Sequence, residues 1–249
     1  MALELIEAGK YFRHPLNDGL TGYWRMEEAS WDGTPGEVID SSGQDNHGSA
    51  KNGATTTASG KLGRGGNFIK ASGQHVSIAS HSISNASAVT LSAWVYPDDD
   101  TNPNTVLGGA GTFLFRVNGN NRKIAMFSSL SVAIVTSENA INLNEWSHIV
   151  FVWDGVNSWF HINGGDKEGI FANTGTLNFP ATIFIGRQGE ALAMRDFSGK
   201  IDEMPIYDRA ISSDEVAVLY NSGAAMLIKP YALPLEAVDI RPELEVIAV

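Results

Sequence analysis

Short apolar runs alternate with turn-forming residues along most of the chain, and this alternation restricts the possible folds more than any other feature. Gly-Asn, Asp-Gly and Asn-Gly steps separate several of the runs, as in VNGNNRK, WDGVNSW and INGGDK. Such steps favour the tight turns of β-hairpins. In SHIVFVWD (147–154) both alternating faces are mostly apolar, which is typical of a strand buried between two layers.

Roughly a dozen short strands without intervening helices predict an all-β fold, an antiparallel two-sheet sandwich. One short helix is expected near the C-terminus, in SSDEVAVLYNSG (212–223). Ser212 precedes Glu215 by three residues, which fits a capping box. The apolar residues that follow have helical spacing, and Gly223 can end the helix.

The character of the sequence changes after Gly223. Residues 224–249 contain three prolines and no glycine, and they are rich in Leu, Ile and Val. Prolines at this spacing exclude a helix and favour an extended path. The segment either folds back over its own core or docks on a neighbouring subunit; docking is favoured because an exposed apolar strand-like segment is costly. We therefore expect an N-terminal segment (1–18), a sandwich domain (19–223) and an extended arm (224–249) that binds other protein subunits in an oligomer.

Charge and composition exclude several classes of function. Seventeen basic and 28 acidic residues give a net charge of −11, so no nucleic-acid partner is expected. The absence of cysteine excludes disulfides, zinc–thiolate sites and thiol nucleophiles. Glu4 and Glu7 lie where a signal peptide needs basic and apolar residues, and no apolar stretch approaches the ~18 residues of a membrane span. We expect no signal peptide, no transmembrane segment and no membrane partner.

Eight motifs occur in an order that resembles a known family: GLTGYWRMEE, VIDSSGQDNHG, GKLGRGGNFIKASGQHVSI, VTLSAWVYP, NEWSHIVFVWDG, WFHINGG, IFIGRQG and FSGKIDEMPIYDRAISSDEVAVLYNSG. Together they resemble a laminin-G-like jelly-roll domain of the concanavalin-A-like lectin/glucanase superfamily, over about residues 19–223. The resemblance implies two curved antiparallel sheets. The family has catalytic and non-catalytic branches, so its fold alone does not decide the function.

The resemblance supplies a test for catalysis. Glycoside hydrolases of this superfamily carry Glu-x-Asp-x-x-Glu on a strand, which places the acids roughly 5–6 Å apart in one cleft. Here Lys200 and Pro205 occupy the positions of the two glutamates. Asp202 and Glu203 are adjacent on the predicted strand and are expected to point to opposite faces. No other catalytic motif is present, His148 and His161 are interpreted as packed strand residues, and no enzymatic activity is expected.

Non-catalytic relatives often hold a structural calcium ion between the Asp of a D-x-S-G loop and the Asp of a G-x-I-D strand. This likeness makes Asp40 and Asp202 the first predicted ligands, followed by Glu28 and Asn46. Alternatively, Asp40 only caps its own turn and Asp202 accepts backbone hydrogen bonds. The loop PDDDTNPN (97–104) imitates an EF-hand but has proline where glycine is needed, so it is predicted to be a solvated turn.

A glycan site needs an exposed aromatic ring with polar groups around it. Trp31 lies in a polar, turn-like stretch, ASWDGTPG, and is the predicted stacking residue unless it covers the calcium loop. Arg116, Asn118 and Arg187 fall on runs that would line the concave sheet. Four other tryptophans lie in family motifs and are expected to be buried: Trp24, Trp94, Trp146 and Trp153.

These observations favour a non-catalytic, lectin-like module that acts as a structural or adhesion component of a larger assembly, such as a decoration or tail-associated protein of a phage virion. The alternative is a calcium-dependent carbohydrate-binding module of a bacterial protein. The expected location is a virion or extracellular surface.

Overall fold

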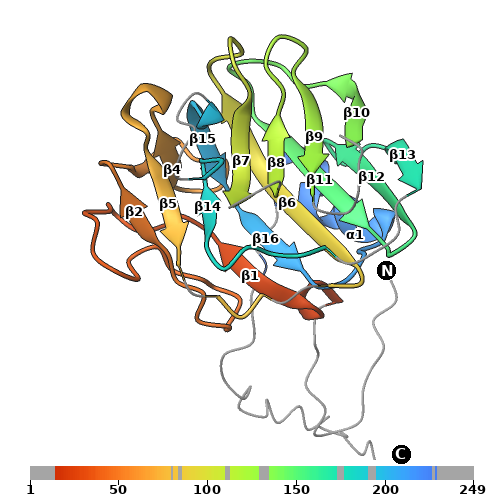
Figure 1. Ribbon diagram of the computed structural model, residues 1–249, viewed down its shortest axis with the longest axis horizontal. Coiled ribbons are helices and arrows are strands. Elements are labelled where there is room, and N and C mark those ends of the chain that lie inside the picture. Colours follow the sequence, from red (N-terminus) through yellow and green to blue (C-terminus); the bar gives the residue numbers. More distant parts are fainter. Residues whose placement is uncertain are drawn as a thin grey trace, which may run out of the picture.

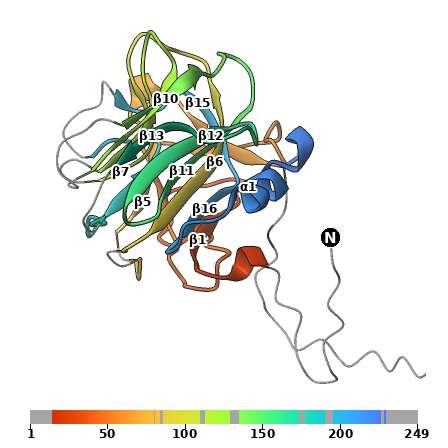
Figure 2. The ribbon, with the colours of Figure 1, turned by 90° about the vertical axis from the view of Figure 1, so that its right-hand side faces the viewer.

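Two antiparallel sheets lie face to face, and a single α-helix packs on the outer side of one of them (Figures 1 and 2). The computed structural model describes residues 15–79, 81–83, 86–109, 113–128, 135–172, 177–189, 195–225 and 228. The predicted all-β, two-sheet jelly-roll sandwich with one short C-terminal helix is confirmed. The predicted extended arm lies outside the described residues, apart from its first residues and Ile228.

The larger sheet has nine strands. Its main path runs β13-β12-β11-β6-β15-β4-β3, while β16 pairs with β6 and β1 pairs with β16. The bounds are β1 Leu20–Trp24, β3 Thr55–Thr57, β4 Gly65–Phe68, β6 Val89–Pro97, β11 Ser147–Trp153, β12 Asn157–Ile162, β13 Glu168–Ala172, β15 Gly199–Asp202 and β16 Met204–Tyr207.

The smaller sheet has seven strands in the order β10-β9-β8-β7-β14-β5-β2, so β2 is an edge strand. The bounds are β2 Ser49–Lys51, β5 His75–Ile78, β7 Asn104–Gly109, β8 Leu114–Val117, β9 Lys123–Phe127, β10 Val135–Ala140 and β14 Ile183–Ile185. Short 3-10 turns η1, η2 and η4 span Pro15–Asn17, Lys70–Ser72 and Asn221–Gly223.

Strand β11 belongs to two hydrophobic cores at once. Ile149, Phe151 and Trp153 point into the main core between the sheets. Val150 and Val152 point to the outer side of the nine-stranded sheet, into a second core under the helix. The doubly apolar pattern of this segment thus has a direct structural cause.

Helix α1 (Ser213–Tyr220) begins with the predicted capping box. The Ser212 hydroxyl accepts a hydrogen bond from the Glu215 backbone N–H, and the Glu215 carboxylate accepts one from the Ser212 N–H. Val216 and Leu219 face the second core. The helix therefore covers one face of the sandwich and leaves the outer face of the seven-stranded sheet on the opposite side (Figure 2).

Both ends of the described chain take part in the second core. Leu16 and Ile228 are 1% and 2% exposed and belong to the same cluster as the helix residues. Arg209 joins this region by donating to the carbonyl oxygens of Pro15 and Asp18 and to the Glu215 carboxylate. Packing of the domain thus extends before residue 19 and beyond residue 223. No helix in the described part of the chain is long and apolar enough to cross a membrane.

Three of the four tryptophans predicted to be buried are so: Trp24, Trp94 and Trp153. The prediction for Trp146 is wrong, because this residue is only partly buried. Its ring packs edge-on against Tyr96, with 5.6 Å between the ring centroids, instead of entering either core.

Candidate functional site

The two adjacent acids lie at a β-bulge between β15 and β16. Asp202 is opposite Trp94 on β6, whereas Ile206 is opposite Leu91. Residue 206 is four residues after 202, whereas its partner Leu91 is only three residues from Trp94 on β6. The segment that joins β15 to β16 therefore contains one inserted residue. Glu203 takes up the insertion with a positive φ of 45°.

The bulge overturns the prediction that the two acids face opposite ways. Ile201, Met204 and Ile206 all point into the core between the sheets. Asp202 and Glu203, which lie between Ile201 and Met204, therefore both point to the outer side of the nine-stranded sheet. Strict alternation holds only for a regular strand, and the extra residue breaks it. Asp202 and Glu203 are nevertheless only 0% and 4% exposed.

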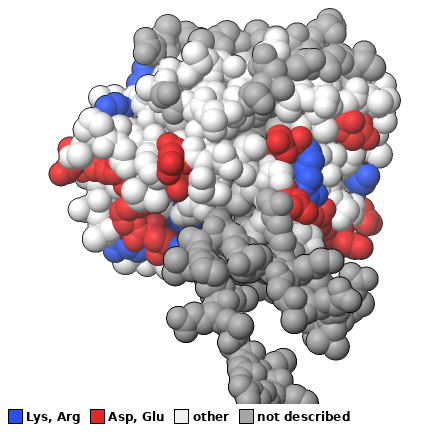
Figure 3. Space-filling model, turned by 90° about the horizontal axis from the view of Figure 1, so that it is seen from below, with Lys and Arg blue, Asp and Glu red and all other residues white. Residues whose placement is uncertain are grey.

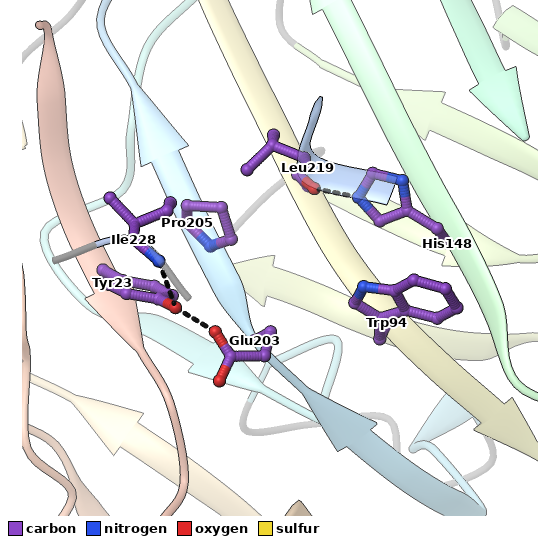
Figure 4. Close-up of a pocket in the computed structure, with 8 residues that line it drawn as sticks. Tyr23, Trp94, His148, Glu203, Pro205, Leu219 and Ile228 are labelled. Carbon is purple, nitrogen blue, oxygen red and sulfur yellow. Dashed lines mark hydrogen bonds between the residues drawn. The ribbon is translucent and has the colours of Figure 1, made fainter. Parts of the chain in front are cut away.

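Glu203 is held in a buried polar contact with Tyr23, and Figure 4 shows the two side chains pointing toward each other. The Tyr23 hydroxyl donates to Glu203 Oε2 and accepts from the Ile228 backbone N–H at 3.4 Å. Arg25 Nε lies 3.8 Å from Glu203 Oε1. Burial raises the pKa of Glu203 to about 7, against the opposing effects of Tyr23 and Arg25.

The Asp202 carboxylate accepts hydrogen bonds from the backbone around it. Its Oδ2 accepts from the N–H groups of Lys61 and Leu62 at 2.7 and 3.0 Å, and its Oδ1 accepts from the Glu203 N–H at 2.8 Å. Burial raises the pKa of Asp202 to about 8, although the Leu62 hydrogen bond works in the opposite direction. The alternative interpretation of this residue, as an acceptor of backbone hydrogen bonds, is confirmed.

The cavity beside Glu203 is too small for a sugar. Its volume of about 10 Å³ suits one water molecule. Eight residues line it, seven of them labelled in Figure 4: Tyr23, Ser92, Trp94, His148, Glu203, Pro205, Leu219 and Ile228.

Ser92 and His148 in this cavity have the spacing of a nucleophile and its base, with 2.8 Å between Ser92 Oγ and His148 Nε2. Each is 1% exposed, and Trp94 and Tyr220 pack over the imidazole. Burial lowers the pKa of His148 to about 3, so the ring stays neutral. These features fit the predicted role of His148 as a packed strand residue.

Asp40 caps its own turn, as the alternative to calcium binding predicted. Oδ1 accepts from the N–H groups of Tyr23 and Ser42 at 2.8 and 2.9 Å. Oδ2 accepts from the Ser42 hydroxyl and from the Asn46 N–H, at 2.8 and 2.9 Å. Both carboxylate oxygens are therefore already occupied by protein donors.

The other predicted calcium ligands are engaged in the same way. Glu28 accepts from the Ile39 N–H and the Trp31 indole N–H, both at 3.0 Å. Asn46 Oδ1 accepts from the Ser82 N–H at 2.7 Å. In the described part of the chain no three His, Asp or Glu side chains form a group that could hold a metal ion. The four predicted ligands do not fit one calcium site in this arrangement, and calcium binding stays a prediction.

Two adjoining pockets on either side of Lys51 and Asn52 form an open groove at the edge of the seven-stranded sheet. We call them the edge pocket and the sheet pocket; their volumes are about 300 and 320 Å³, the size of small-ligand sites. The edge pocket is lined by Trp31, Asp32, Gly33, Ala50, Lys51, Asn52, Gly53 and Ala54. The sheet pocket is lined by Lys51, Asn52, His75, Ser77, Phe184 and Arg187.

The register of three strands explains the hollow of the sheet pocket. Ser77 on β5 lies between Ser49 on β2 and Phe184 on β14, so two short side chains adjoin one ring. Two residues along these strands, on the same face, Lys51 lies opposite His75. The short side chains of Ser49 and Ser77 therefore leave a hollow, and the longer side chains of Lys51, His75 and Phe184 surround it.

The wall of the edge pocket is fixed by Glu37. Its carboxylate accepts from the N–H groups of Asp32, Gly33 and Ala50, at 2.6, 2.8 and 3.2 Å. These bonds fasten the loop after Trp31 to strand β2. A wall that is already ordered lowers the entropic cost of binding a ligand.

The predicted exposed stacking residue, Trp31, is 6% exposed, so this expectation is wrong. Its indole N–H reaches Glu28, and its ring lies 6.4 Å from the Phe68 ring. Trp31 still lines the edge pocket, and Arg187 lines the sheet pocket. The structure thus brings two of the four predicted ligand-binding residues to one groove.

Arg116 and Asn118 lie on and just after β8 and do not line either pocket. They contact each other, with 2.9 Å between Arg116 Nε and Asn118 Oδ1, and the Arg116 guanidinium stacks on Phe127. Among the groove residues that sequence reasoning missed, His75 and Ser77 alternate with Val76 and Ile78, and this period-two pattern was the available signal.

Comparison with known proteins places this geometry in a family. The model of the concanavalin A-like lectin/glucanases superfamily matches residues 70–217, more than half of the chain. The chain belongs to this superfamily. The resemblance found in the sequence is thereby confirmed.

Solved structures of the superfamily fold include binding domains and enzymes. Domain 4 of AbnA, an extracellular arabinanase from Geobacillus stearothermophilus in complex with arabinotriose, matches 83% of this chain and 98% of its own at 19% identity and a TM-score of 0.63. The binding domain of Paraclostridial Mosquitocidal Protein 1 matches 84% of this chain and 53% of its own at 18% identity and a TM-score of 0.64.

A sialidase from Trypanosoma rangeli in complex with 2,3-difluorosialic acid matches 82% of this chain and 33% of its own, at 14% identity and a TM-score of 0.55. The chain spans about half of the mosquitocidal binding domain and a third of the sialidase. At such identities the likeness concerns the fold. No curated protein matches the chain significantly.

Proposed function

We propose that this chain is a non-catalytic glycan-binding module whose ligand lies in the groove at the edge of the seven-stranded sheet. The observation that carries the proposal is the pair of open, adjoining pockets, whose linings combine polar side chains and backbone with the largely buried rings of Trp31 and Phe184. Convergent polar groups in an open pocket can form hydrogen bonds with the hydroxyl groups of a sugar. The binding domains with the same fold support this assignment.

The lack of catalysis is proposed on separate grounds. Asp202 and Glu203 are buried on the helix-covered side of the nine-stranded sheet, beside a cavity of about 10 Å³. A retaining glycosidase needs both carboxyl groups against the scissile bond. Neither carboxyl group lines the proposed groove.

The test is a glycan array, followed by calorimetric titration, with the full chain and two variants. Ser77→Trp fills the centre of the sheet pocket and is expected to weaken binding of the best array ligand at least tenfold. Val156→Trp adds the same side chain at a position that is 58% exposed and outside the groove, and is expected to bind as the wild type does. Equal binding by all three proteins, with unchanged thermal stability, would refute the assignment of the groove.

A role in a larger assembly, including a virion, and a dependence on calcium remain finer proposals. The arm that suggested assembly lies mostly outside the described residues, and the predicted calcium ligands are occupied by N–H donors. Both are tested by the experiments in the Discussion.

A further inference from the structure

The lining of the sheet pocket has a charge opposite to that of the chain as a whole. The protein has a net charge of −11, and one face shows large groups of acidic residues with smaller basic groups between them (Figure 3). The sheet pocket, in contrast, is lined by Lys51, His75 and Arg187, and its remaining described lining residues are uncharged. No acidic residue is among the described residues that line it.

The basic side chains have defined positions. Lys51 and His75 are direct cross-strand partners, so their side chains emerge side by side on the outer face. Arg187 Nε donates to the Gly189 carbonyl at 2.8 Å, which orients the guanidinium. His75 Nδ1 lies 2.9 Å from the Gly73 carbonyl oxygen and 3.4 Å from Arg187 Nη1, which keeps the imidazole beside the guanidinium.

Two carboxyl groups lie on elements beside the sheet pocket. Asp196 lies behind Gly73, near the Arg187 guanidinium, and is 0% exposed. Burial raises the pKa of Asp196 to about 6, against the effect of Arg187. Asp32 lines the edge pocket, where its carboxylate accepts from the Thr34 N–H at 2.9 Å. Neither carboxyl group lines the sheet pocket.

We propose that the ligand of the sheet pocket is a sugar that carries a carboxylate, which binds to Lys51 and Arg187; this inference rests on the proposed glycan-binding function. A planar guanidinium recognises a carboxylate through two parallel hydrogen bonds, and lysine adds a point charge. Ser77 and Asn52 supply hydroxyl and amide groups for the rest of the sugar. The net charge of −11 disfavours binding of an anionic sugar to the surface in general, whereas no acidic residue is among the described residues that line this pocket.

Two kinds of sugar carry this group, and the probes distinguish them. Trigalacturonate is compared with its methyl ester, and sialyllactose with lactose, by calorimetric titration of the full chain at pH 7 and 50 mM NaCl. At least one acidic probe is expected to bind about tenfold more tightly than its uncharged counterpart, the loss expected for one charge-assisted hydrogen bond. The pair that shows the difference identifies a uronic acid or a sialic acid as the source.

Two variants test whether the tighter binding of acidic probes depends on the basic residues of the sheet pocket. Lys51→Ala changes an exposed side chain and is expected to weaken binding of the acidic probe about tenfold. Lys123→Ala, on β9 of the same sheet and outside the groove, is the matched control and is expected to have no effect. Raising NaCl to 500 mM is expected to weaken acidic probes selectively.

The outcomes separate this inference from the proposed function. Equal binding of acidic and uncharged probes, sensitive to Ser77→Trp, would overturn the carboxylate inference and leave the groove as a glycan site. Acidic probes that bind equally to wild type and Lys51→Ala, or that do not bind at all, would also overturn it. If array ligands bind to Ser77→Trp with the same affinity as to wild type, the proposed site itself is overturned.

Discussion

The buried carboxyl group of Glu203 makes the folded state less stable as it ionises, and Glu203→Gln should remove this effect. The folded-state pKa is about 7 against an unfolded value of 4.5, so the folded state holds the proton more tightly. The resulting stabilisation is fully present below pH 4.5 and is lost as the pH rises through 7. Asp202, with a pKa raised to about 8, acts in the same direction.

The size of the effect follows from the shift. A difference of roughly 2.5 pKa units at about 1.4 kcal/mol each gives on the order of 3 kcal/mol at pH 7.5. Glutamine keeps an oxygen that can accept from the Tyr23 hydroxyl but has no charge to bury. We therefore expect Glu203→Gln to be up to about 3 kcal/mol more stable than wild type at pH 7.5, and nearly equal to it at pH 4.5.

Guanidinium unfolding followed by tryptophan fluorescence at pH 4.5, 6 and 7.5 measures this difference. Glu145→Gln makes the same chemical change at an exposed position and should leave the pH profile unchanged. If Glu203→Gln is no more stable than wild type at pH 7.5, and its stability has the same slope with pH, the burial of this carboxyl group does not set the pH dependence.

Three further experiments address other parts of the molecule. Asp40→Ala removes an acceptor of four hydrogen bonds and should cost about 2–4 kcal/mol in unfolding free energy, measured by denaturant titration; a loss below 1 kcal/mol would contradict the role of the cap. Calcium titration of the chelator-stripped protein tests the proposed calcium dependence; saturable heat at millimolar calcium that is lost in Asp202→Asn would support it, and no saturable heat would refute it. Removing residues 229–249 should preserve the melting temperature and, if the arm mediates assembly, reduce the oligomer on size-exclusion chromatography. Removing 224–249 should also lower the melting temperature, because Ile228 leaves the second core; equal melting temperatures would contradict that packing.

Periodicity and turn chemistry were sufficient to predict the sandwich and its helix, because both depend on local patterns. The capping box of Ser212 and the doubly apolar strand β11 are examples. The bulge at Glu203 could not be predicted in this way. Its positive φ falls on a residue that rarely adopts it, and only the register against β6 reveals the inserted residue.

The candidate site was harder to predict because it depends on contacts distant in sequence. Trp31 has polar neighbours in the chain, yet its ring is covered through Phe68 and its N–H is satisfied by Glu28. Two of the three backbone donors to Asp202 come from Lys61 and Leu62, about 140 residues away. Only after the sheet is assembled do β2, β5 and β14 bring the groove residues together.

The helix-side location of the second core has a practical consequence for presenting this protein on a surface. Leu16 and Ile228, near the two ends of the described chain, are both anchored there, on the side away from the seven-stranded sheet. A bead, sensor chip or fusion partner attached close to residue 15 or residue 228 would adjoin the side of the molecule that carries the second core, while the groove faced the solution. Protein immobilised in this way should therefore give the same affinities for the glycan probes as free protein, if the groove is the binding site proposed above.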